Sequence, residues 1–252
     1  MNPPQGTATT TDERVLNDVD TYGPAYMRVA ERLGGYEETE AEAEQVIELL
    51  GLQEGDLVLD AACGFGRFAE ALSRHGVEAV GIDISPAAIA EAERRRSGPR
   101  YLVHDLTQPL PADVGPFDAL VNVYSSFGYG VTVSEDMEML ACLHRALRPG
   151  GSIVMQLSDL ERSRHRLRSD AEPVVRWTNG VKETLTVSFA TGELHVRYEL
   201  DGDVVDSRIR MYEQEDLVSM FEQVGFTDIS AYGDFTGKVK APADRLVLVA
   251  QA

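Results

Sequence analysis

Short apolar runs alternate with longer stretches of helical periodicity over the first 160 residues. The runs have the length of buried strands, and acidic residues, glycine or proline bound them. We expect five such strands: Leu57–Leu59, Glu78–Ile82, Tyr101–Val103, Phe117–Asn122 and Ser152–Leu157. Helices are expected between them, from the first glycine turn to about His75, at Pro86–Arg96 and at Glu135–Leu147. Strands that alternate with helices at this spacing predict an α/β fold with a doubly wound, mainly parallel sheet.

The pattern changes after Leu157. A highly charged link, Glu161–Asp170, precedes four segments in which apolar and polar residues alternate with the period of two typical of antiparallel strands. These segments are Val174–Trp177, Thr184–Phe189, Leu194–Leu200 and Val205–Met211. Asn-Gly, Thr-Gly and Asp-Gly pairs lie between them as hairpin turns. We therefore expect an inserted antiparallel β-sheet within residues 161–211, either as a lid over the site or as the surface of a homodimer.

Further segments complete the expected organisation at both ends of the chain. Residues 1–11 are rich in Pro, Thr, Gln and Gly and predict a disordered tail, and residues 12–50 predict a helical lid. Gly23-Pro24 is expected to divide the first lid helix, Asp12–Arg32, and Gly51 to end the second, Glu37–Leu50. A seven-stranded core over residues 51–160 and 212–252 is completed by the helix Glu213–Val224 and the strands Thr227–Tyr232 and Arg245–Ala250.

Charge and composition exclude several classes of partner. The 252 residues include 42 acidic and 23 basic ones, and the net charge of −19 repels nucleic acid and anionic membranes. No apolar run approaches the roughly 20 residues of a membrane span, and Cys63 and Cys142 do not resemble a disulfide framework. We therefore expect a cytoplasmic protein without nucleic-acid or membrane partners. The histidines have no partners at metal-ligand spacing, so no metal site is predicted.

The turn after the first strand is the strongest candidate for a ligand site. Gly64 and Gly66 follow the strand and precede an alanine-rich helix. Glycine is needed where the backbone turns sharply or lies against a ligand, and a helix N-terminus points unsatisfied N–H groups at this position. Ligands of such sheets bind at the carboxyl ends of the strands. The polar residues expected at those ends are Asp60, Asp83, Asp105 and Asn122.

The turn leaves the class of nucleotide open. Residues 64–69 fit the G-x-G-x-x-G/A pattern of dinucleotide enzymes, and Asp83 lies about where such enzymes carry an acid for the ribose. An NAD-dependent oxidoreductase is therefore one alternative. Against it, Asp60 places a negative charge where a pyrophosphate would lie, and no phosphate-binding cation is obvious besides Arg67. A ligand with a ribose and a positive centre but no phosphate suits the turn better.

Five segments resemble the motifs of class I S-adenosylmethionine-dependent methyltransferases, in the order of that family. They are Val58–Gly66, Val80–Ser85, His104–Leu106, Phe117–Tyr129 and Leu147–Gly151. The fourth-strand segment, the helical lid and the antiparallel insertion are most similar to small-molecule methyltransferases of secondary metabolism. The resemblance implies a Rossmann-like methyltransferase fold with S-adenosyl-L-methionine as the cofactor.

The resemblance also implies roles for single residues. Asp83 would accept hydrogen bonds from both ribose hydroxyls, Asp105 would accept one from the adenine amino group, and Asp60 would neighbour the α-ammonium or the N–H groups of the turn. The residues implied to bind the cofactor are Asp60, Ala61, Ala62, Gly64, Gly66, Arg67, Asp83, Ile84, Asp105, Leu106, Asn122 and Tyr124.

Methyl transfer from a sulfonium needs little side-chain chemistry. The protein must hold a lone pair roughly 3–3.5 Å from the methyl group and exclude water, and a base nearby helps a hydroxyl acceptor. Three residues are candidates for catalysis: Tyr22, Tyr124 and His104. Aromatic residues expected to line the acceptor site are Tyr22, Tyr26, Phe127 and Tyr129. A structural role is the alternative for His104, and core packing for Phe127 and Tyr129.

The sequence thus predicts methyl transfer to an amine or hydroxyl of a small molecule. A secondary metabolite such as an amino sugar or a peptide is the expected acceptor. An NAD-dependent oxidoreductase and a non-catalytic S-adenosylmethionine-binding protein are the alternatives. The acidic balance favours a cationic or neutral acceptor slightly over an anionic one.

Overall fold

The computed structural model describes residue 19 and residues 21–34, 37–167 and 169–252. The tail expected over residues 1–11 and the first part of the helix expected over residues 12–32 lie outside the described residues. Two helices form the described part of the expected lid, α1 (Pro24–Leu33) and α2 (Thr39–Leu50). Proline suits the first position of α1 because its missing N–H has no partner there. Gly51 ends α2 in the left-handed conformation, which glycine adopts without a Cβ penalty.

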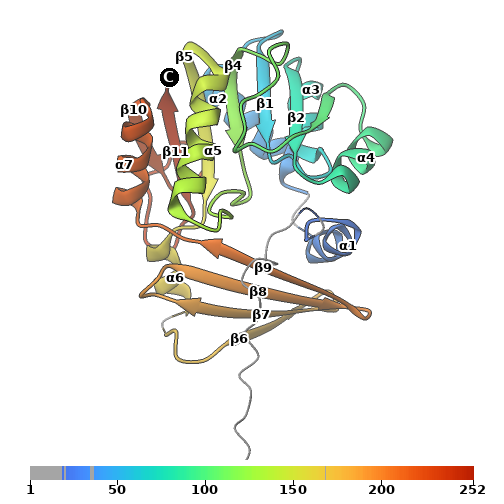
Figure 1. Cartoon of the computed structure of the whole chain (residues 1–252), viewed down its shortest axis with the longest axis vertical. Helices are drawn as coiled ribbons and strands as arrows, with labels where there is room; N and C mark the ends of the chain where they lie inside the picture. The colour runs from blue at the N-terminus through green and yellow to red at the C-terminus, as the bar shows by residue number, and fades with distance from the viewer. Residues whose placement is uncertain (1–18, 20, 35–36, 168) are drawn as a thin grey trace, which may run out of the picture.

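A seven-stranded sheet with the order β10-β11-β5-β4-β1-β2-β3 forms the centre of the core (Figure 1). Its strands are β1 (Leu57–Ala61), β2 (Glu78–Asp83), β3 (Arg100–Val103), β4 (Phe117–Asn122), β5 (Leu147–Leu157), β10 (Thr227–Tyr232) and β11 (Leu246–Gln251). The first five strands are parallel, whereas β11 is antiparallel to both β5 and β10. The predicted doubly wound, mainly parallel sheet of seven strands is therefore confirmed.

The strand order reverses at β1, which pairs with β2 on one side and with β4 on the other. The loops after β1 and β4 therefore leave neighbouring strands in opposite directions. Such a switch point opens a crevice at the carboxyl edge of the sheet, where ligands bind. The glycine turn and the loop after Asn122 face each other across this crevice.

Helices cover both faces of this sheet. α5 (Val133–Ala146) and α7 (Gln214–Val224) bury their apolar sides against one face, and α2 and α3 (Arg67–Arg74) cover the other. α4 (Pro86–Arg95) packs beside β2 and β3. Successive strand residues point to opposite faces. Val58 and Leu59 of β1 accordingly enter different cores.

The insertion is a separate four-stranded antiparallel sheet with the order β6-β7-β8-β9. Its strands are β6 (Val174–Thr178), β7 (Val181–Ser188), β8 (Glu193–Leu200) and β9 (Asp203–Arg210). The sheet lies below the carboxyl edge of the core in Figure 1. This confirms the expected inserted antiparallel sheet.

A helix, α6 (Leu160–Leu167), lies in the segment that the sequence indicated only as a charged link. Asp159 precedes the helix, and its carboxylate accepts a hydrogen bond from the backbone N–H of Arg162 at 2.8 Å, as an N-cap does. Leu160 and Leu167 pack with Val187 in a small core beside the insertion. One narrow apolar edge therefore anchors a helix whose other residues are mostly charged.

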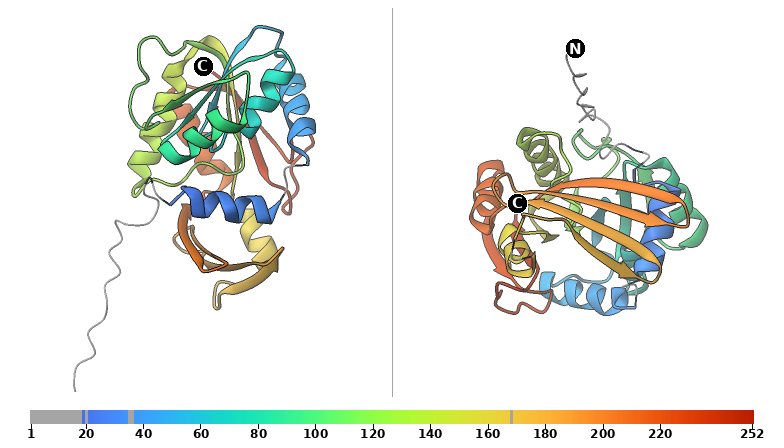
Figure 2. Two further views of the ribbon diagram at one scale, coloured as in Figure 1. Left: turned by 90° about the vertical axis from the view of Figure 1, so that its right-hand side faces the viewer. Right: turned by 90° about the horizontal axis from the view of Figure 1, so that it is seen from below.

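α1 lies between the core and the insertion (Figure 2). Val29 is fully buried against Val181 and Leu200 of the insertion. The Arg28 guanidinium pairs with Asp203 at 2.5 Å, and the Asn179 amide donates to the Arg32 carbonyl oxygen at 2.9 Å. These contacts fix the lid helix to the insertion.

None of the helices in the described part of the chain is both long and apolar enough to cross a membrane.

Candidate active site

The two glycines of the turn after β1 have different surroundings. Both adopt positive φ, 54° at Gly64 and 76° at Gly66. A Cβ on Gly64 would have no atom within 4 Å, whereas a Cβ on Gly66 would lie 2.4 Å from the Tyr101 hydroxyl. Gly64 therefore leaves open space beside the turn, and Gly66 leaves room for Tyr101. Ala62 in the same turn also has a positive φ, 59°, which is unusual for a residue with a side chain.

Asp60 anchors the helix that follows this turn. The N-cap of α3 is Gly66, which has no side chain to accept a hydrogen bond. The buried Asp60 carboxylate supplies the missing acceptor and receives the Ala69 N–H at 2.9 Å. Burial raises the pKa of Asp60 to about 7, with the nearby Asp83 carboxylate adding to the shift. The structure thus shows capping of α3, and the contact with an α-ammonium stays a prediction.

Asp83 ends β2 directly beside the turn. One carboxylate oxygen accepts the Gly64 N–H at 2.8 Å and the other accepts the Ser85 N–H at 2.9 Å. Each oxygen retains capacity for a second donor, so these bonds fix the carboxylate in place without saturating it. Burial raises the pKa of Asp83. Next to it, the Ile84 side chain is exposed, at 42%.

The loop after β3 holds the residues expected at the adenine. Asp105 accepts hydrogen bonds from the backbone N–H and the hydroxyl of Thr107 at 2.9 and 2.8 Å, which fixes its carboxylate. The Leu106 side chain is buried in the core. His104 contacts the carbonyl oxygen of Gln108 at 3.3 Å, within the same loop. His104 therefore lies at the β3 end of the site.

Asn122 ends β4 on the other side of the crevice. Its amide nitrogen donates to the carbonyl oxygens of Ala61 and Ser126 at 2.8 and 3.2 Å, so it joins the end of β1 to the loop after β4. Its side-chain oxygen is buried and has no hydrogen-bond partner among the described residues. A buried acceptor without a partner is costly, so this atom fits a site whose ligand brings a donor.

Tyr124 follows Asn122 in a strained loop. Tyr124 and Ser125 have φ values of 60° and 63°. The Arg67 guanidinium lies 3.9 Å from the centre of the Tyr124 ring, and the Tyr124 hydroxyl donates to the Glu42 carboxylate at 2.6 Å. Burial raises the pKa of Tyr124. The hydroxyl is thus a hydrogen-bond donor at neutral pH, and its expected role as a base stays a prediction.

Tyrosines from three parts of the chain meet above the crevice. The Tyr22 ring lies 5.1 Å from that of Tyr26 and 5.3 Å from that of Tyr129, and Tyr26 lies 6.4 Å from Tyr198 of β8. The Tyr22 and Ser207 hydroxyls are 2.8 Å apart. Burial is the main cause that raises the pKa of each of the four tyrosines. The structure therefore brings together Tyr22, Tyr26 and Tyr129, as expected for an acceptor site.

Phe127 lies elsewhere. It is 4% exposed, belongs to the main core, and its ring centre is 6.2 Å from that of Tyr212. The structure therefore places Phe127 in the core, which was the alternative to lining the pocket.

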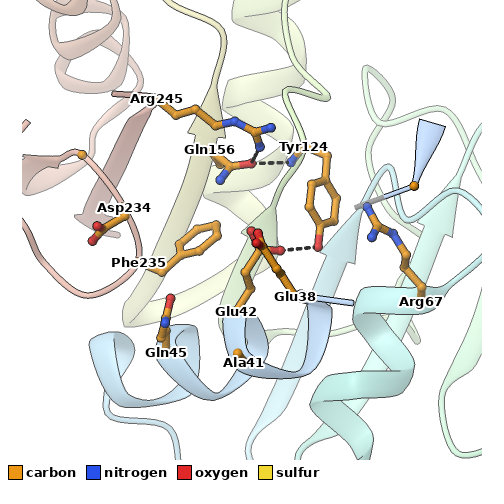
Figure 3. A pocket seen from close by; sticks show the side chains of 12 residues that line it. Glu38, Ala41, Glu42, Gln45, Arg67, Tyr124, Gln156, Asp234, Phe235 and Arg245 are labelled. Atoms are coloured by element: carbon orange, nitrogen blue, oxygen red, sulfur yellow. Dashed lines mark hydrogen bonds between the residues drawn. The ribbon is translucent and has the colours of Figure 1, made fainter. Parts of the chain in front are cut away.

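A cavity of about 480 Å³ opens next to the glycine turn (Figure 3). Arg67 and Tyr124 form its wall toward the turn. The other lining residues are Gly34, Glu38, Ala41, Glu42, Gln45, Gln156, Gly233, Asp234, Phe235 and Arg245. Gln156 accepts the Tyr124 backbone N–H at 3.2 Å and the Arg245 guanidinium at 2.7 Å, so it links the two ends of the cavity.

The sequence did not indicate the cavity residues Glu42, Gln156 and Arg245. A buried glutamine within the apolar run of β5 was a usable signal, because buried polar side chains need partners. Glu42 is one of several acids on α2, and nothing in the sequence distinguishes it from its solvent-exposed neighbours. The described residues contain no group of His, Cys, Asp or Glu that could hold a metal ion.

Comparisons with known proteins agree with this geometry. Residues 58–151 match the family model described as a methyltransferase domain. A demethylmenaquinone methyltransferase of Beutenbergia cavernae is 38% identical over 109 residues, 43% of each chain. The chain thus spans about half the length, or less, of the curated relatives with which it aligns first.

Solved structures share the fold over nearly the whole chain. The CcbJ methyltransferase from Streptomyces caelestis has a TM-score of 0.79 at 16% identity, over 93% of this chain and 99% of that one. CalS10 with bound S-adenosylmethionine, an amino pentose methyltransferase from Micromonospora echinaspora, has a TM-score of 0.64 at 18% identity, over 90% and 96%.

Proposed function

We propose that this chain uses S-adenosyl-L-methionine to methylate an amine or hydroxyl of a small molecule. Its residues 58–151 match the methyltransferase domain family, and its fold is that of the class I S-adenosylmethionine-dependent methyltransferases. A secondary metabolite such as an amino sugar or a peptide is the proposed acceptor. CalS10 acts on an amino pentose, which supports this class, although at 18% identity it shares only the fold.

The residues at the crevice fit the cofactor. Three features lie around one switch point: open space beside Gly64, the fixed Asp83 carboxylate, and the Asn122 oxygen, which has no partner within the described part of the chain. Asp83 would hold the ribose and Asp105 the adenine. Asn122 would accept a hydrogen bond from the amino group of the cofactor's methionine part. When bound, the cofactor supplies an electrophilic methyl group on a sulfonium centre.

One observation carries the proposal of a small acceptor: the cavity is lined by Arg67, which directly follows the glycine turn, and by Tyr124, whose ring centre lies 3.9 Å from the Arg67 guanidinium. Its volume, about 480 Å³, is within the range of small-molecule sites. We propose that the tyrosine cluster and α1, which lies between the core and the insertion in Figure 2, exclude water from the reacting atoms.

Glu42 is the proposed proton acceptor in this cavity. Burial raises the pKa of Tyr22 and of Tyr124 above the ordinary value of 10, so neither phenol can act as a base at neutral pH. Glu42 lines the cavity and is oriented by the Tyr124 hydroxyl. A carboxylate in this position can accept a hydrogen bond from an amine or hydroxyl acceptor and take its proton.

Titration calorimetry with S-adenosylhomocysteine tests the cofactor assignment. Asp83→Asn removes the charge but keeps the side-chain shape, and we expect it to weaken binding at least tenfold. Glu78→Gln, at the exposed opposite end of β2, is the matched control and should bind like the wild type. Equal affinity of the two variants would contradict the role of Asp83.

Two further measurements separate the alternatives. A fluorescence titration with NADH would show binding if the protein were an oxidoreductase. A panel of amine and hydroxyl acceptors with labelled S-adenosylmethionine should yield methylated product. Cofactor binding without turnover over the whole panel would favour a non-catalytic binding protein.

We also propose a homodimer through the outer face of the inserted sheet. Trp177 of β6 is 69% exposed and lies in one cross-strand row with Lys182, Glu199 and Val204, which is 47% exposed. Sedimentation equilibrium of the wild type and of Trp177→Glu tests it: the variant should shift toward the monomer, and a monomeric wild type would refute the proposal.

A further inference from the structure

The loop between β4 and α5 carries Tyr129 and lies against the edge of the inserted sheet. β9 is an edge strand of that sheet and its nearest strand to the core (Figure 1). The Arg210 backbone N–H donates to the Gly128 carbonyl oxygen at 2.7 Å. A Cβ on Gly128 would lie 2.1 Å from the Arg210 carbonyl oxygen, so only glycine allows this close approach. The residue before Tyr129 is therefore fixed to β9.

The Arg210 side chain fixes the residues after Tyr129. Its guanidinium donates to the carbonyl oxygens of Gly130 and Val131 at 3.2 and 2.9 Å. The same group donates to one oxygen of the Asp136 carboxylate at 2.9 Å. The other oxygen of Asp136 accepts the Gly130 N–H, also at 2.9 Å. Arg210 of β9 and Asp136 of α5 therefore hold the backbone that follows Tyr129 from two different elements.

The ion pair of Asp136 and Arg210 is itself withdrawn from water. Asp136 is 2% exposed, and the Tyr212 hydroxyl donates to the carboxylate oxygen that Arg210 contacts, at 2.5 Å. Charges that leave water lose their hydration, and a buried ion pair often adds little net stability. Its hydrogen bonds are directional, however, so they define where the loop lies. This points to a role in geometry.

β9 also holds the tyrosine that contacts Tyr129. Ser207 of β9 has its hydroxyl 2.8 Å from that of Tyr22, and the Tyr22 ring centre lies 5.3 Å from that of Tyr129. Ser207 and Arg210 are on the same strand. The two tyrosines therefore take their relative position from β9, although they come from parts of the chain on either side of the cofactor motifs.

We propose that Asp136 and Arg210 are positioning residues of the acceptor site, which fix residues 128–131 so that the Tyr129 ring meets Tyr22. The inference rests on the proposed methyltransferase function and deepens it. Neither residue of the pair lines the cavity, so both act through Tyr129. The cofactor is held by Asp83, which lies on another loop. Loss of the pair should therefore weaken acceptor binding and leave cofactor binding unchanged.

Fluorine NMR of the full-length protein, with 3-fluorotyrosine at all nine tyrosine positions, tests the positioning directly. The resonance that is missing from Tyr129→Phe belongs to Tyr129. Arg210→Gln should shift and broaden this resonance, because the loop loses its fixed position. Arg197→Gln removes an exposed pair with Asp206 on the same sheet. It is the matched control and should leave the resonance unchanged.

A second variant separates position from stability. Arg210→Gln alone leaves the Asp136 charge buried without its partner, which is destabilising. Asp136→Asn combined with Arg210→Gln removes both charges, so this double variant should fold. Glutamine cannot replace the guanidinium fork that reaches a carboxylate and two carbonyl oxygens at once. We therefore expect the same change of the Tyr129 resonance in the double variant.

Kinetics measure the consequence, with the acceptor that the wild type turns over fastest in the panel described above. Arg210→Gln and the double variant should raise the KM for this acceptor at least fivefold and change the KM for S-adenosylmethionine less than twofold. Arg197→Gln should behave like the wild type.

The outcomes separate the inference from the function on which it rests. An unmoved Tyr129 resonance or an unchanged acceptor KM in the folded double variant would overturn the inference, because the pair would then serve stability alone. Equal changes in Arg197→Gln and Arg210→Gln would also overturn it. A wild type that binds no S-adenosylhomocysteine, or methylates nothing in the panel, would instead contradict the proposed function, and the NMR result would still decide whether the pair positions Tyr129.

Discussion

Alanine substitution at the two glycines of the β1 turn should have opposite consequences. Gly64 and Gly66 are two residues apart, and both have left-handed backbone conformations. Only Gly66 faces a protein side chain, because the Tyr101 hydroxyl and ring lie 2.4–2.6 Å from where its Cβ would be. Gly64 faces open space. We therefore expect Gly64→Ala to impair the ligand site and Gly66→Ala to impair the fold.

The structure gives the size of each effect. A left-handed backbone costs alanine about 1–2 kcal/mol relative to glycine, and both variants carry this cost. Gly66→Ala adds overpacking against Tyr101, typically about 1–3 kcal/mol. The free energy of unfolding should thus fall by about 1–2 kcal/mol in Gly64→Ala and by about 2–5 kcal/mol in Gly66→Ala.

Urea denaturation followed by circular dichroism measures the stabilities, and calorimetry measures the affinity for S-adenosylhomocysteine. We expect Gly64→Ala to lose at least tenfold in affinity, about 1.4 kcal/mol, because its methyl group would occupy space beside the turn. Tyr101→Leu removes the phenol atoms that a Cβ at position 66 would meet. Combined with Gly66→Ala, Tyr101→Leu should restore part of the lost stability. Combined with Gly64→Ala, it should restore none of the lost affinity for S-adenosylhomocysteine.

Two results would refute this reasoning. If Gly66→Ala is no less stable than Gly64→Ala, the contact with Tyr101 does not explain the glycine. If Gly64→Ala binds S-adenosylhomocysteine like the wild type, the open space beside the turn is not where the cofactor lies.

Three other substitutions test the surroundings of the site. Burial raises the pKa of Asp60 from 3.8 to about 7, so the stability that its protonated form contributes is present below pH 4 and is lost as the pH rises to 7. Asp60→Asn has no charge to bury, so its urea midpoint should exceed that of the wild type at pH 7.5 but not at pH 4. Glu42→Gln should lower kcat at least tenfold with unchanged S-adenosylhomocysteine affinity, and an unchanged kcat would exclude Glu42 as the proton acceptor. Tyr22→Phe loses the 2.8 Å contact with Ser207 and should cost about 0.5–1.5 kcal/mol in thermal unfolding, whereas an unchanged midpoint would show that the contact does not hold the lid.

The fold could be predicted because each strand of the core is visible in the sequence as a local pattern of apolar residues. Strands buried on both faces are continuous apolar runs, and Asp60, Asp83 and Asn122 mark where they end. The helix α6 was missed because only its two terminal leucines are apolar, too few to show a helical period. Its formation depends on the Asp159 cap and on a tertiary core that no local pattern contains.

The cofactor side of the site was predictable, and the acceptor side was not. Asp83 lies 19 residues from Gly64 along the chain and belongs to an adjacent motif with fixed spacing. Glu42 and Tyr124 are 82 residues apart, and Gln156 and Arg245 are 89 apart. Such pairs come from elements whose relative position is set by packing. Sequence periodicity places a residue on a face of its own helix or strand but does not say which distant residue it will meet.

The lining of the cavity also limits what the net charge says about an acceptor. Exposed charges act on a ligand over about a Debye length, roughly 8 Å at physiological ionic strength. Of the 42 acidic residues, Glu38, Glu42 and Asp234 line the cavity, and salt screens exposed acids on the outer surface from it. Arg67 and Arg245 line the cavity itself, so their charges are screened least. The sign of the acceptor is therefore decided by the few charged groups that line the cavity, which are the carboxylates of Glu38, Glu42 and Asp234 and the guanidinium groups of Arg67 and Arg245.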